Sequence, residues 1–571
     1  MKVWRTAAVD EAAAVRLADD LSVPLPFARL LAARGFAARE SAEAYLNPRL
    51  KTLSDPGDLP GMPAAAEAVW AGIAAGKRIA IYGDYDVDGV SATALLVRAF
   101  RALGATVEPF LPHRLEDGYG LTADTVERCI DRHRPALIVT VDCGTYSADA
   151  VARARERGVD VVITDHHQSS GAPAPAVAVV NPRLGPPGRP WSELAGVGVA
   201  LKLAHAVLKL AREAGAAGAE GVDLRGFFDL VALGTVADCV ALTGENRVLV
   251  RHGLDVLRRA PSIGIRALMQ VASLKEEPDA WHIGFLLAPR LNAAGRLGTA
   301  EASLDLLLAT DAGRAAALAR DLDRANRERQ ELEQGIVAGA VARIEADFDP
   351  ARDFAIVVAD PAWHPGVIGI VASRLVARYN RPAVVIALNG EGGGRGSCRG
   401  IEAVDLALAL RECSGLLGRC GGHAMAAGLD IEASRVDEFR VRFNEVIALR
   451  VNGRVPPPVL PVDAWLPLDE ADEVLLDCIE RARPCGQGNP APVWAARDVA
   501  VEDWQVMKEK HVRLRLRQGA AVCAAVGFNL AARGRPEGRV DVAFEVRRDT
   551  WNGRNGIQLQ LRDFRPAGAG P

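Results

Sequence analysis

The stretch RIAIYGDYDVDGVSATALLVRAFRAL, residues 78–103, joins a short apolar run, an acidic turn and a longer apolar stretch. Residues 79–82 have the length of a buried strand, and residues 90–103 have the length of a helix. The same alternation follows at the apolar runs 137–141, 159–163 and 177–180. Short buried strands that alternate with helices predict βαβ units and a parallel sheet. Polar residues that directly follow the strands are therefore expected at the edge where such sheets bind ligands.

Three carboxylates alternate in the turn after the first strand. Asp84, Asp86 and Asp88 precede Gly89, which permits a tight turn. Acidic groups this close together are costly unless a cation compensates their charge. The pattern also begins like an EF-hand loop, but that loop needs glutamate at its twelfth position, where this chain has Leu95. A solvated acidic turn without a ligand is the remaining alternative.

Further candidate ligands end later apolar segments. They are Asp142 after the second run, His166 and His167 after the third, and Asp238 at the end of the segment 230–238. Each acid alone is also a plausible helix cap. Together, carboxylates and imidazoles suit Mn²⁺, or Mg²⁺ that keeps its waters, and they outnumber the ligands that one cation needs. Two cations about 3.5–4 Å apart would use them for phosphoryl transfer.

The remaining sequence suggests several domains in a chain of 571 residues. Residues 314–334 contain no glycine or proline and predict a long connecting helix, and a second α/β pattern follows. We expect an N-terminal helical lead-in at 1–75, a catalytic α/β domain at 76–300, a connecting helix at 301–345, a second α/β domain at 346–450 and a C-terminal β-barrel at 451–571.

The composition limits the partners and the compartment. The formal charge is −4, so any site for a polyanion must be local. Nine cysteines without regular spacing do not indicate a disulfide framework. No stretch of about 18 apolar residues lacks a charge, so we expect a cytoplasmic protein without a membrane partner.

The ordered motifs GDYDVDG, VDCG, TDHH and GTVAD, at 83–89, 141–144, 164–167 and 234–238, resemble the DHH phosphoesterase superfamily. The segments PHRLEDGYG, APRLNAAGR, HPGVIGIVASR and GGHAMAAG are similar to the bacterial RecJ family. The resemblance implies a DHH domain, a DHHA1-type domain and an OB-like barrel. It also implies a metal-dependent 5′→3′ exonuclease that degrades single-stranded DNA to 5′-mononucleotides in DNA repair and recombination.

The resemblance also assigns residues to the metal site. It implies catalytic metal ligands for two Mn²⁺ or Mg²⁺ ions at Asp86, Asp88, Asp142, His166 and Asp238, with Asp84 and His167 as further ligands or supporting groups. A water activated by one ion would attack the phosphorus, and the second ion would stabilise the leaving oxygen.

Substrate contacts are predicted in both α/β domains. The segment 394–400 looks like a glycine-rich turn. The resemblance implies that Ser397 and Arg399 in this turn bind the terminal 5′ phosphate of the substrate. Relatives have serine where this chain has Gly400, which removes one hydroxyl. A further candidate is Arg114, for a second phosphate. Candidates along the path of the DNA strand are Arg290, Asn292 and Arg296. The candidates at the cleft between the two α/β domains are His364 and His423.

The C-terminal region is locally basic. Residues 511–517 alternate, so Arg513, Arg515 and Arg517 are expected on one strand face that follows a phosphate backbone. An ordinary half-exposed strand has the same pattern. Aromatic residues available either for base stacking or for the core are Trp504, Phe528 and Trp551.

Two other functions remain open at this point. One is a DHH-family phosphodiesterase for short oligonucleotides or cyclic dinucleotides, or a manganese pyrophosphatase. The other is an inactive DHH scaffold that only binds DNA. The favoured interpretation predicts single-stranded DNA with a 5′ end as the substrate, with single-strand-binding protein and a repair helicase as partners.

Overall fold

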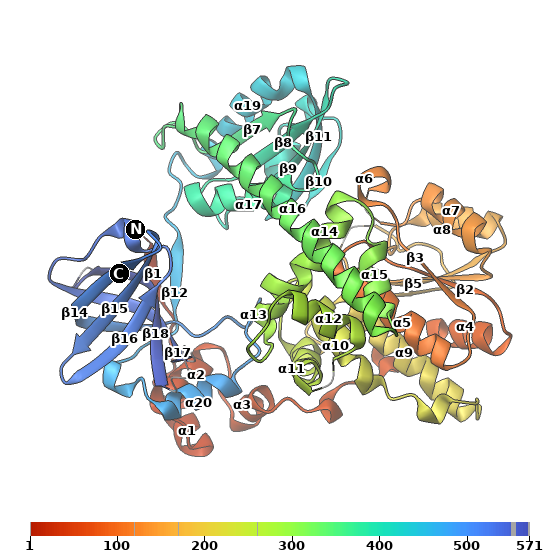
Figure 1. Cartoon of the computed structure of the whole chain (residues 1–571), viewed down its shortest axis with the longest axis horizontal. Helices are drawn as coiled ribbons and strands as arrows, with labels where there is room; N and C mark the ends of the chain where they lie inside the picture. Colours follow the sequence, from red (N-terminus) through yellow and green to blue (C-terminus); the bar gives the residue numbers. More distant parts are fainter. Residues whose placement is uncertain (1, 119, 169–170, 260, 550–555, 569–571) are drawn as a thin grey trace. The chain divides into compact units, whose positions relative to one another are not determined.

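The structure is a computed structural model that describes residues 2–118, 120–168, 171–259, 261–549 and 556–568. The chain forms two compact units (Figure 1). One unit is Ser54–Pro456, and the other combines Met1–Leu53 with Pro457–Pro571. The N-terminal segment joins the C-terminal part of the chain because β1 (Val3–Thr6) pairs in parallel with β12 (Val459–Val462).

The first sheet of the larger unit is parallel throughout, as the sequence predicts. Its strands, in the order β3-β2-β4-β5-β6, are β3 (Val107–Phe110), β2 (Ile79–Tyr82), β4 (Leu137–Thr140), β5 (Asp160–Thr164) and β6 (Ala178–Val180). Every residue of β2 and β4 is buried, because helices cover both faces of the sheet. The adjoining helices are α4 (Met62–Ala74), α5 (Val87–Ala102), α6 (Arg114–Asp117), α7 (Ala123–His133), α8 (Ala148–Glu156) and α9 (Gly196–Glu213).

A helical layer follows this sheet. It contains α10 (Phe228–Ala237), α11 (Gly244–Arg259), α12 (Ile263–Val271), α13 (Ala280–His282), the π-helical turn Ile283–Leu287, α14 (Ala288–Leu297) and α15 (Glu301–Leu308). The long helix α16 (Ala312–Glu345) has 34 residues and spans about 50 Å. It packs on α12 and α14 and also on α17 (Ile368–Tyr379), so it connects the two α/β parts of the unit.

The second sheet has the order β10-β11-β9-β8-β7 and is mixed. Its strands are β7 (Ile356–Asp360), β8 (Ala383–Leu388), β9 (Gly393–Arg399), β10 (Cys420–Gly422) and β11 (Ala426–Glu432), and α18 (Leu406–Arg411) and α19 (Val436–Arg450) complete this part. The turn predicted at 394–400 is wrong, because this segment is a central antiparallel strand. A Cβ at Gly396 would lie 2.7 Å from Leu429 Cδ1, so the glycine makes room for a neighbouring strand's side chain.

The smaller unit contains the predicted OB-like barrel, which is confirmed. Its strands are β13 (Ala464–Trp465), β14 (Trp494–Met507), β15 (His511–Gln518), β16 (Ala521–Gly527), β17 (Arg539–Asp549) and β18 (Gly556–Pro566). Strand β14 pairs with both β15 and β17, and β16 pairs with β18, which closes the barrel.

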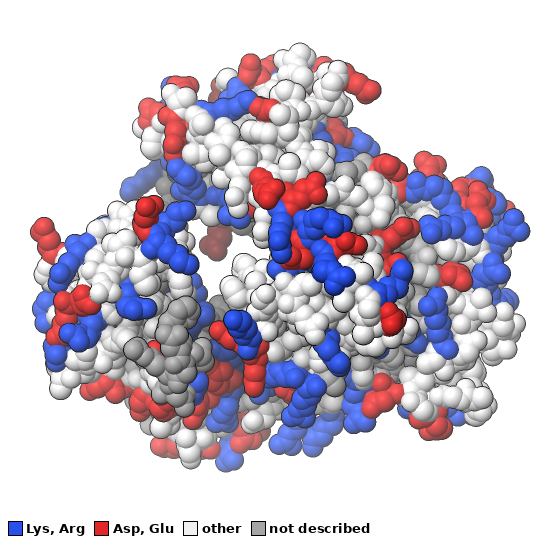
Figure 2. Space-filling model, viewed as in Figure 1, with Lys and Arg blue, Asp and Glu red and all other residues white. Residues whose placement is uncertain are grey.

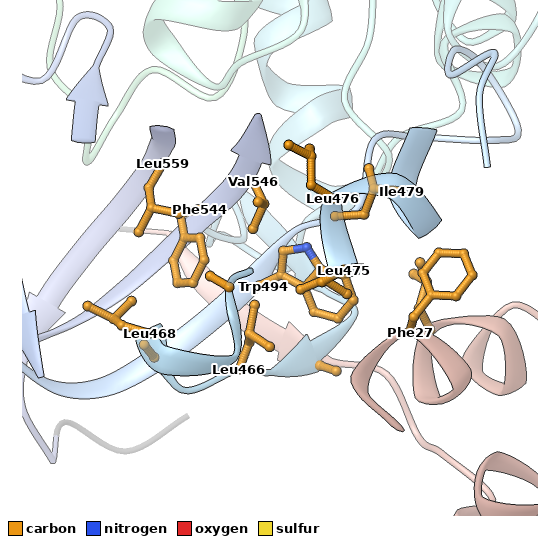
Figure 3. Close-up of a cluster of buried hydrophobic side chains, with 14 of the residues drawn as sticks. Phe27, Leu466, Leu468, Leu475, Leu476, Ile479, Trp494, Phe544, Val546 and Leu559 are labelled. Carbon is orange, nitrogen blue, oxygen red and sulfur yellow. The ribbon is translucent and has the colours of Figure 1, made fainter. Parts of the chain in front are cut away.

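The core of this unit joins segments from both ends of the chain. Figure 3 shows Trp494 and Phe544 of the barrel near Leu475 of α20 (Glu473–Arg481), with Phe27 on the N-terminal side. The N-terminal helices are α1 (Glu11–Leu21), α2 (Leu25–Ala33) and α3 (Arg39–Leu46). None of the helices that the structure describes is long and apolar enough to cross a membrane.

Candidate metal centre and phosphate cavity

The acidic turn between β2 and α5 is fixed by its own backbone. Asp86 caps α5, because its Oδ1 accepts hydrogen bonds from the backbone N–H groups of Asp88 (2.9 Å) and Gly89 (3.1 Å). A Cβ at Gly89 would lie 2.6 Å from the backbone N and O of Asp84. Glycine is therefore needed here for close packing of the turn onto the helix.

The seven predicted ligand residues lie together. His166 Nε2 is 3.0 Å from Asp142 Oδ1, 3.5 Å from Asp238 Oδ2 and 3.8 Å from Asp88 Oδ2. Three overlapping groups have ligand atoms within 4.8 Å of one another: Asp142, His166 and His167; Asp88, His166 and Asp238; and Asp84, Asp86 and Asp142. Asp238 reaches the cluster from the C-terminal end of α10, while the others follow the strands.

Glycines of two helices allow this crowding. Asp88 accepts hydrogen bonds from the backbone N–H groups of Gly196 (2.6 Å) and Val197 (2.9 Å) at the start of α9. A Cβ at Gly196 would lie 2.7 Å from Asp142 Oδ1, and a Cβ at Gly234 of α10 would lie 2.7 Å from Asp88 Oδ1. The backbone thus approaches both carboxylates as closely as glycine permits.

Asp165, the acid of the TDHH motif at 164–167, supports the two histidines that follow it. Its Oδ1 accepts from the backbone N–H of His166 (2.7 Å) and lies 2.9 Å from His167 Nδ1. Its Oδ2 accepts from the backbone N–H and the hydroxyl of Thr145. Burial opposes ionisation, but these hydrogen bonds and His167 lower the pKa of Asp165 to about 2. Asp165 therefore orients both histidines as a carboxylate.

The cluster is electrostatically unfavourable without a cation. Burial, followed by repulsion from Asp86, raises the pKa of Asp88 to about 7. Burial and the neighbouring carboxylates raise the pKa of Asp238 to about 8, and burial lowers the pKa of His166 to about 3, which leaves a neutral imidazole. Asp84 Oδ1 is buried and has no hydrogen-bond partner among the described residues. Carboxylates and a neutral imidazole that converge in this way fit hard or borderline divalent cations.

A cavity of about 860 Å³ lies beside the acidic turn. It extends from Tyr85 to β9. Its basic and hydroxyl lining residues are Arg114, Arg296, Arg395, Ser397, Arg399, Arg419 and Ser373, and its acidic lining residues are Glu116, Asp117 and Asp430. Burial, together with the charges of Arg114, Arg329 and Arg399, lowers the pKa of Arg296 to about 10. Arg399 Nη1 donates to Ser397 Oγ at 3.2 Å. The excess of arginines over carboxylates in this lining suits an anion such as phosphate.

Four of the predicted substrate residues therefore share one cavity. Ser397 and Arg399 reach it because alternate residues of β9 point to the same side, whereas Cys398 between them is buried. Sequence reasoning missed Tyr85, whose ring lies 4.8 Å from the guanidinium carbon of Arg114. Its position between two predicted ligands in the acidic turn is a signal that points to the site.

Other predicted substrate residues lie elsewhere. Arg290 pairs with Asp323 of α16 at 2.9 Å and does not line the cavity. Asn292 is half-buried on α14. His364 Nδ1 accepts from the backbone N–H of Gly366 at 3.1 Å, and it also does not line the cavity. His423 is exposed in the turn between β10 and β11.

The barrel strand β15 presents its arginines as the alternation predicts. Arg513, Arg515 and Arg517 are exposed, and the residues between them are buried. Arg515 and Arg517 both pair with Glu502, which reduces the positive charge of this face. Of the candidate stacking residues, Trp504 packs partly on the core, Phe528 is exposed beside His511, and Trp551 lies outside the described residues.

Family models match three parts of the chain. The DHH family, N-terminal domain, matches residues 78–235, the DHHA1 domain matches residues 352–449, and the RecJ OB domain matches residues 462–563. These ranges cover the parallel sheet, the mixed sheet and the barrel, respectively.

Similar proteins extend over almost the whole chain. The single-stranded-DNA-specific exonuclease RecJ of Bacillus subtilis is 34% identical over 98% of this chain and 70% of that protein. The crystal structure of RecJ from Thermus thermophilus in complex with Mn²⁺ has a TM-score of 0.85 and 32% identity, and covers 99% of this chain and 80% of that one. Its complex with Mg²⁺ has a TM-score of 0.79 and 31% identity, and covers 99% of this chain and 79% of that one.

Proposed function

Because the chain belongs to the RecJ family of single-stranded-DNA-specific exonucleases, we propose that it hydrolyses single-stranded DNA from the 5′ end and releases 5′-mononucleotides. The observation that carries this proposal is the position of the acidic cluster beside an arginine-lined cavity within one unit. One site fits divalent cations and the other fits the terminal phosphate of the substrate.

The acidic cluster would hold Mn²⁺ or Mg²⁺ through Asp86, Asp88, Asp142, His166 and Asp238, with Asp84 and His167 at its border. A pair of such cations supplies an activated water and neutralises the charge that develops on the scissile phosphate. The chain itself fixes the ligands: the start of α9 holds Asp88, and Asp165 holds the two histidines. These contacts would keep the ligands in place when the metal and the substrate exchange.

The cavity would hold the terminal 5′ phosphate. Arg399 and Arg296 would supply charged donors from the two α/β parts, and Ser397 would supply a hydroxyl. Arg296 Nη1 also donates to the backbone O of Gly366 at 3.1 Å, which ties α14 to the turn before α17. A phosphate in this cavity would place the next phosphodiester towards the acidic turn, which supports removal of single nucleotides from the 5′ end.

The barrel favours a polymeric substrate over a cyclic dinucleotide. Its exposed face on β15 carries three arginines, and a short substrate would not need a separate basic strand. Single-strand-binding protein and a repair helicase stay predicted partners, because the proposed substrate is an unpaired strand. The cytoplasm stays the predicted compartment.

The test uses single-stranded DNA labelled at either end. With Mn²⁺ present, we expect the 5′ label to appear first as a mononucleotide and the product to vanish when a chelator is added. Asp142→Asn should reduce the rate by about 100-fold or more, because it replaces a charged ligand. Asp149→Asn, at an exposed position at the start of α8, is the matched control. Release of the 3′ label first, or activity that survives both chelation and Asp142→Asn, would refute the proposal.

A further inference from the structure

Two aromatic side chains are exposed together on one helix of the larger unit. Trp281 is 52% exposed and Phe285 is 66% exposed, and Phe285 is the most exposed phenylalanine or tryptophan that the structure describes. Their rings stack with centroids 5.3 Å apart and an interplanar angle of 24°. Residues four apart share one helix face, so the pair forms a continuous apolar surface open to solvent.

The helix that carries this pair runs alongside the acidic cluster. Residues 280–297 continue through α13, the π-helical turn and α14. A Cβ at Gly284 would lie 3.9 Å from Val236 Cγ1, two residues before Asp238. Near the other end, a Cβ at Gly295 would lie 3.1 Å from the backbone O of Tyr85 in the acidic turn. The aromatic pair therefore lies at one end of a helix whose other end reaches the acidic turn.

The same helix links the pair to the phosphate cavity. Arg296 lines that cavity, eleven residues after Phe285, which is about 16 Å along a helix. A stacked nucleotide covers about 3.4 Å of strand and an extended one roughly twice that, so this length corresponds to roughly two to five nucleotides. A strand whose 5′ phosphate occupies the cavity would pass the acidic cluster and then reach the aromatic pair.

The charges near the pair favour contact with bases over contact with phosphates. Asp279 Oδ1 lies 2.6 Å from His282 Nδ1, and Glu276 Oε2 lies 3.8 Å from His282 Nε2. These carboxylates would repel a phosphate backbone. A base presents a neutral, polarisable face, and stacking on an aromatic ring does not depend on sequence.

We propose that Trp281 and Phe285 form a stacking platform for the bases of single-stranded DNA that lie roughly two to five nucleotides 3′ of the terminal phosphate. This inference rests on the proposed exonuclease function and assigns the pair to substrate binding. The platform holds the strand while the terminal nucleotide is removed, so it contributes to KM for long strands and leaves the chemical step unchanged.

The first experiment compares substrate lengths in the full-length protein with Mn²⁺. The substrates are 5′-phosphorylated dT dinucleotide and dT dodecanucleotide, and the variants are Trp281→Ala, Phe285→Ala and Phe285→Tyr. For each alanine variant we expect KM for the dodecanucleotide to rise about 5- to 150-fold, the range of base stacking on one aromatic ring. KM for the dinucleotide and kcat for both substrates should stay within about twofold of wild type. Phe285→Tyr should keep KM for the dodecanucleotide near the wild-type value, because tyrosine also presents an aromatic ring. Val441→Ala, another exposed apolar position, is the control.

A second experiment moves one abasic site along the dodecanucleotide. In the wild type, KM should rise when the abasic site reaches the positions over the platform. In the double alanine variant, the same abasic site should cause no further rise in KM. An equal loss on the dinucleotide would overturn the platform in favour of a structural role. Unchanged KM on the dodecanucleotide would also overturn it, and would point to a protein partner at this surface. A wild-type protein that cuts neither substrate would instead refute the exonuclease function.

Discussion

Gly234 of α10 offers a direct test of how tightly the metal centre is built. An alanine Cβ at this position would lie 2.7 Å from Asp88 Oδ1 and 2.8 Å from Val197 Cγ1. Ordinary contacts between such atoms begin near 3.5 Å, so Asp88 or α10 must move by roughly 0.5–1 Å. Asp88 cannot move freely, because its carboxylate is held by two backbone N–H groups of α9.

The expected effect of Gly234→Ala is larger on activity than on stability. A ligand displaced by up to about 1 Å costs roughly 10- to 100-fold in metal affinity or rate. Overpacking costs about 1–3 kcal/mol of unfolding free energy, and the better helix propensity of alanine returns about 1 kcal/mol. We therefore expect a fall in Mn²⁺ affinity and kcat of at least about 10-fold, with a loss of stability of about 2 kcal/mol or less.

The assay measures initial rates on 5′-labelled single-stranded DNA as a function of Mn²⁺, together with chemical denaturation. The control is Gly335→Ala in α16, where an added Cβ meets nothing within 4 Å. This variant should gain up to about 1 kcal/mol of stability and keep its activity. Wild-type Mn²⁺ affinity and rate in Gly234→Ala would show that the carboxylate position is not critical, and the reasoning would fail.

Three further predictions follow from the site. In the metal-free protein, Asp88 and Asp238 keep their protons up to pKa values of about 7 and 8, whereas the unfolded chain loses them near about pH 4. The melting temperature measured with a chelator should therefore fall as the pH rises from about 4 to 8, and Mn²⁺ should reverse the fall at neutral pH. Asp165→Ala should lower Mn²⁺ affinity about 10- to 100-fold in calorimetric titrations, because His167 loses its partner. Arg399→Ala should reduce the preference for a 5′-phosphorylated over a 5′-hydroxyl end by about 10-fold in competition assays.

The sequence was sufficient to predict that the candidate ligands at the strand ends lie together, because apolar runs mark the strands and parallel strands end at one edge. Asp84, Asp142 and His166 follow directly from this rule. Asp238 is different, because it ends a helix whose position depends on packing against α5, α9 and α11. The sequence marks Asp238 only as the acid that ends an apolar segment, where a helix cap is an equal explanation, and the resemblance to a known family implies that it is a metal ligand.

Other features depended on contacts that sequence patterns do not encode. The glycines of the segment 394–400 suggested a turn, but Gly394 and Gly396 lie in β9, where large side chains of β8 and β11 fill the space beside them. Arg290 turns away from the cavity towards Asp323, which is 33 residues further along the chain. The N-terminal strand pairs with β12 near the other end of the sequence. In each case the deciding partner is distant in sequence.

The charges of the site also explain how a chain with a net charge of −4 binds a polyanion. Acidic and basic side chains are intermingled on the molecular face seen in Figure 2, which gives no large positive field there. Attraction must instead come from local groups. Burial and mutual repulsion make the ionised carboxylates electrostatically unfavourable until divalent cations bind. The same effects make the clustered arginines of the neighbouring cavity unfavourable until an anion binds. In the proposed function, a strand with a 5′ phosphate would relieve the repulsion among the arginines and would bring its scissile phosphate to the cations that relieve the repulsion among the carboxylates. The proposal therefore derives recognition of the end and catalysis from the same buried charges, and it predicts weaker binding and slower cleavage for a strand that lacks the terminal phosphate.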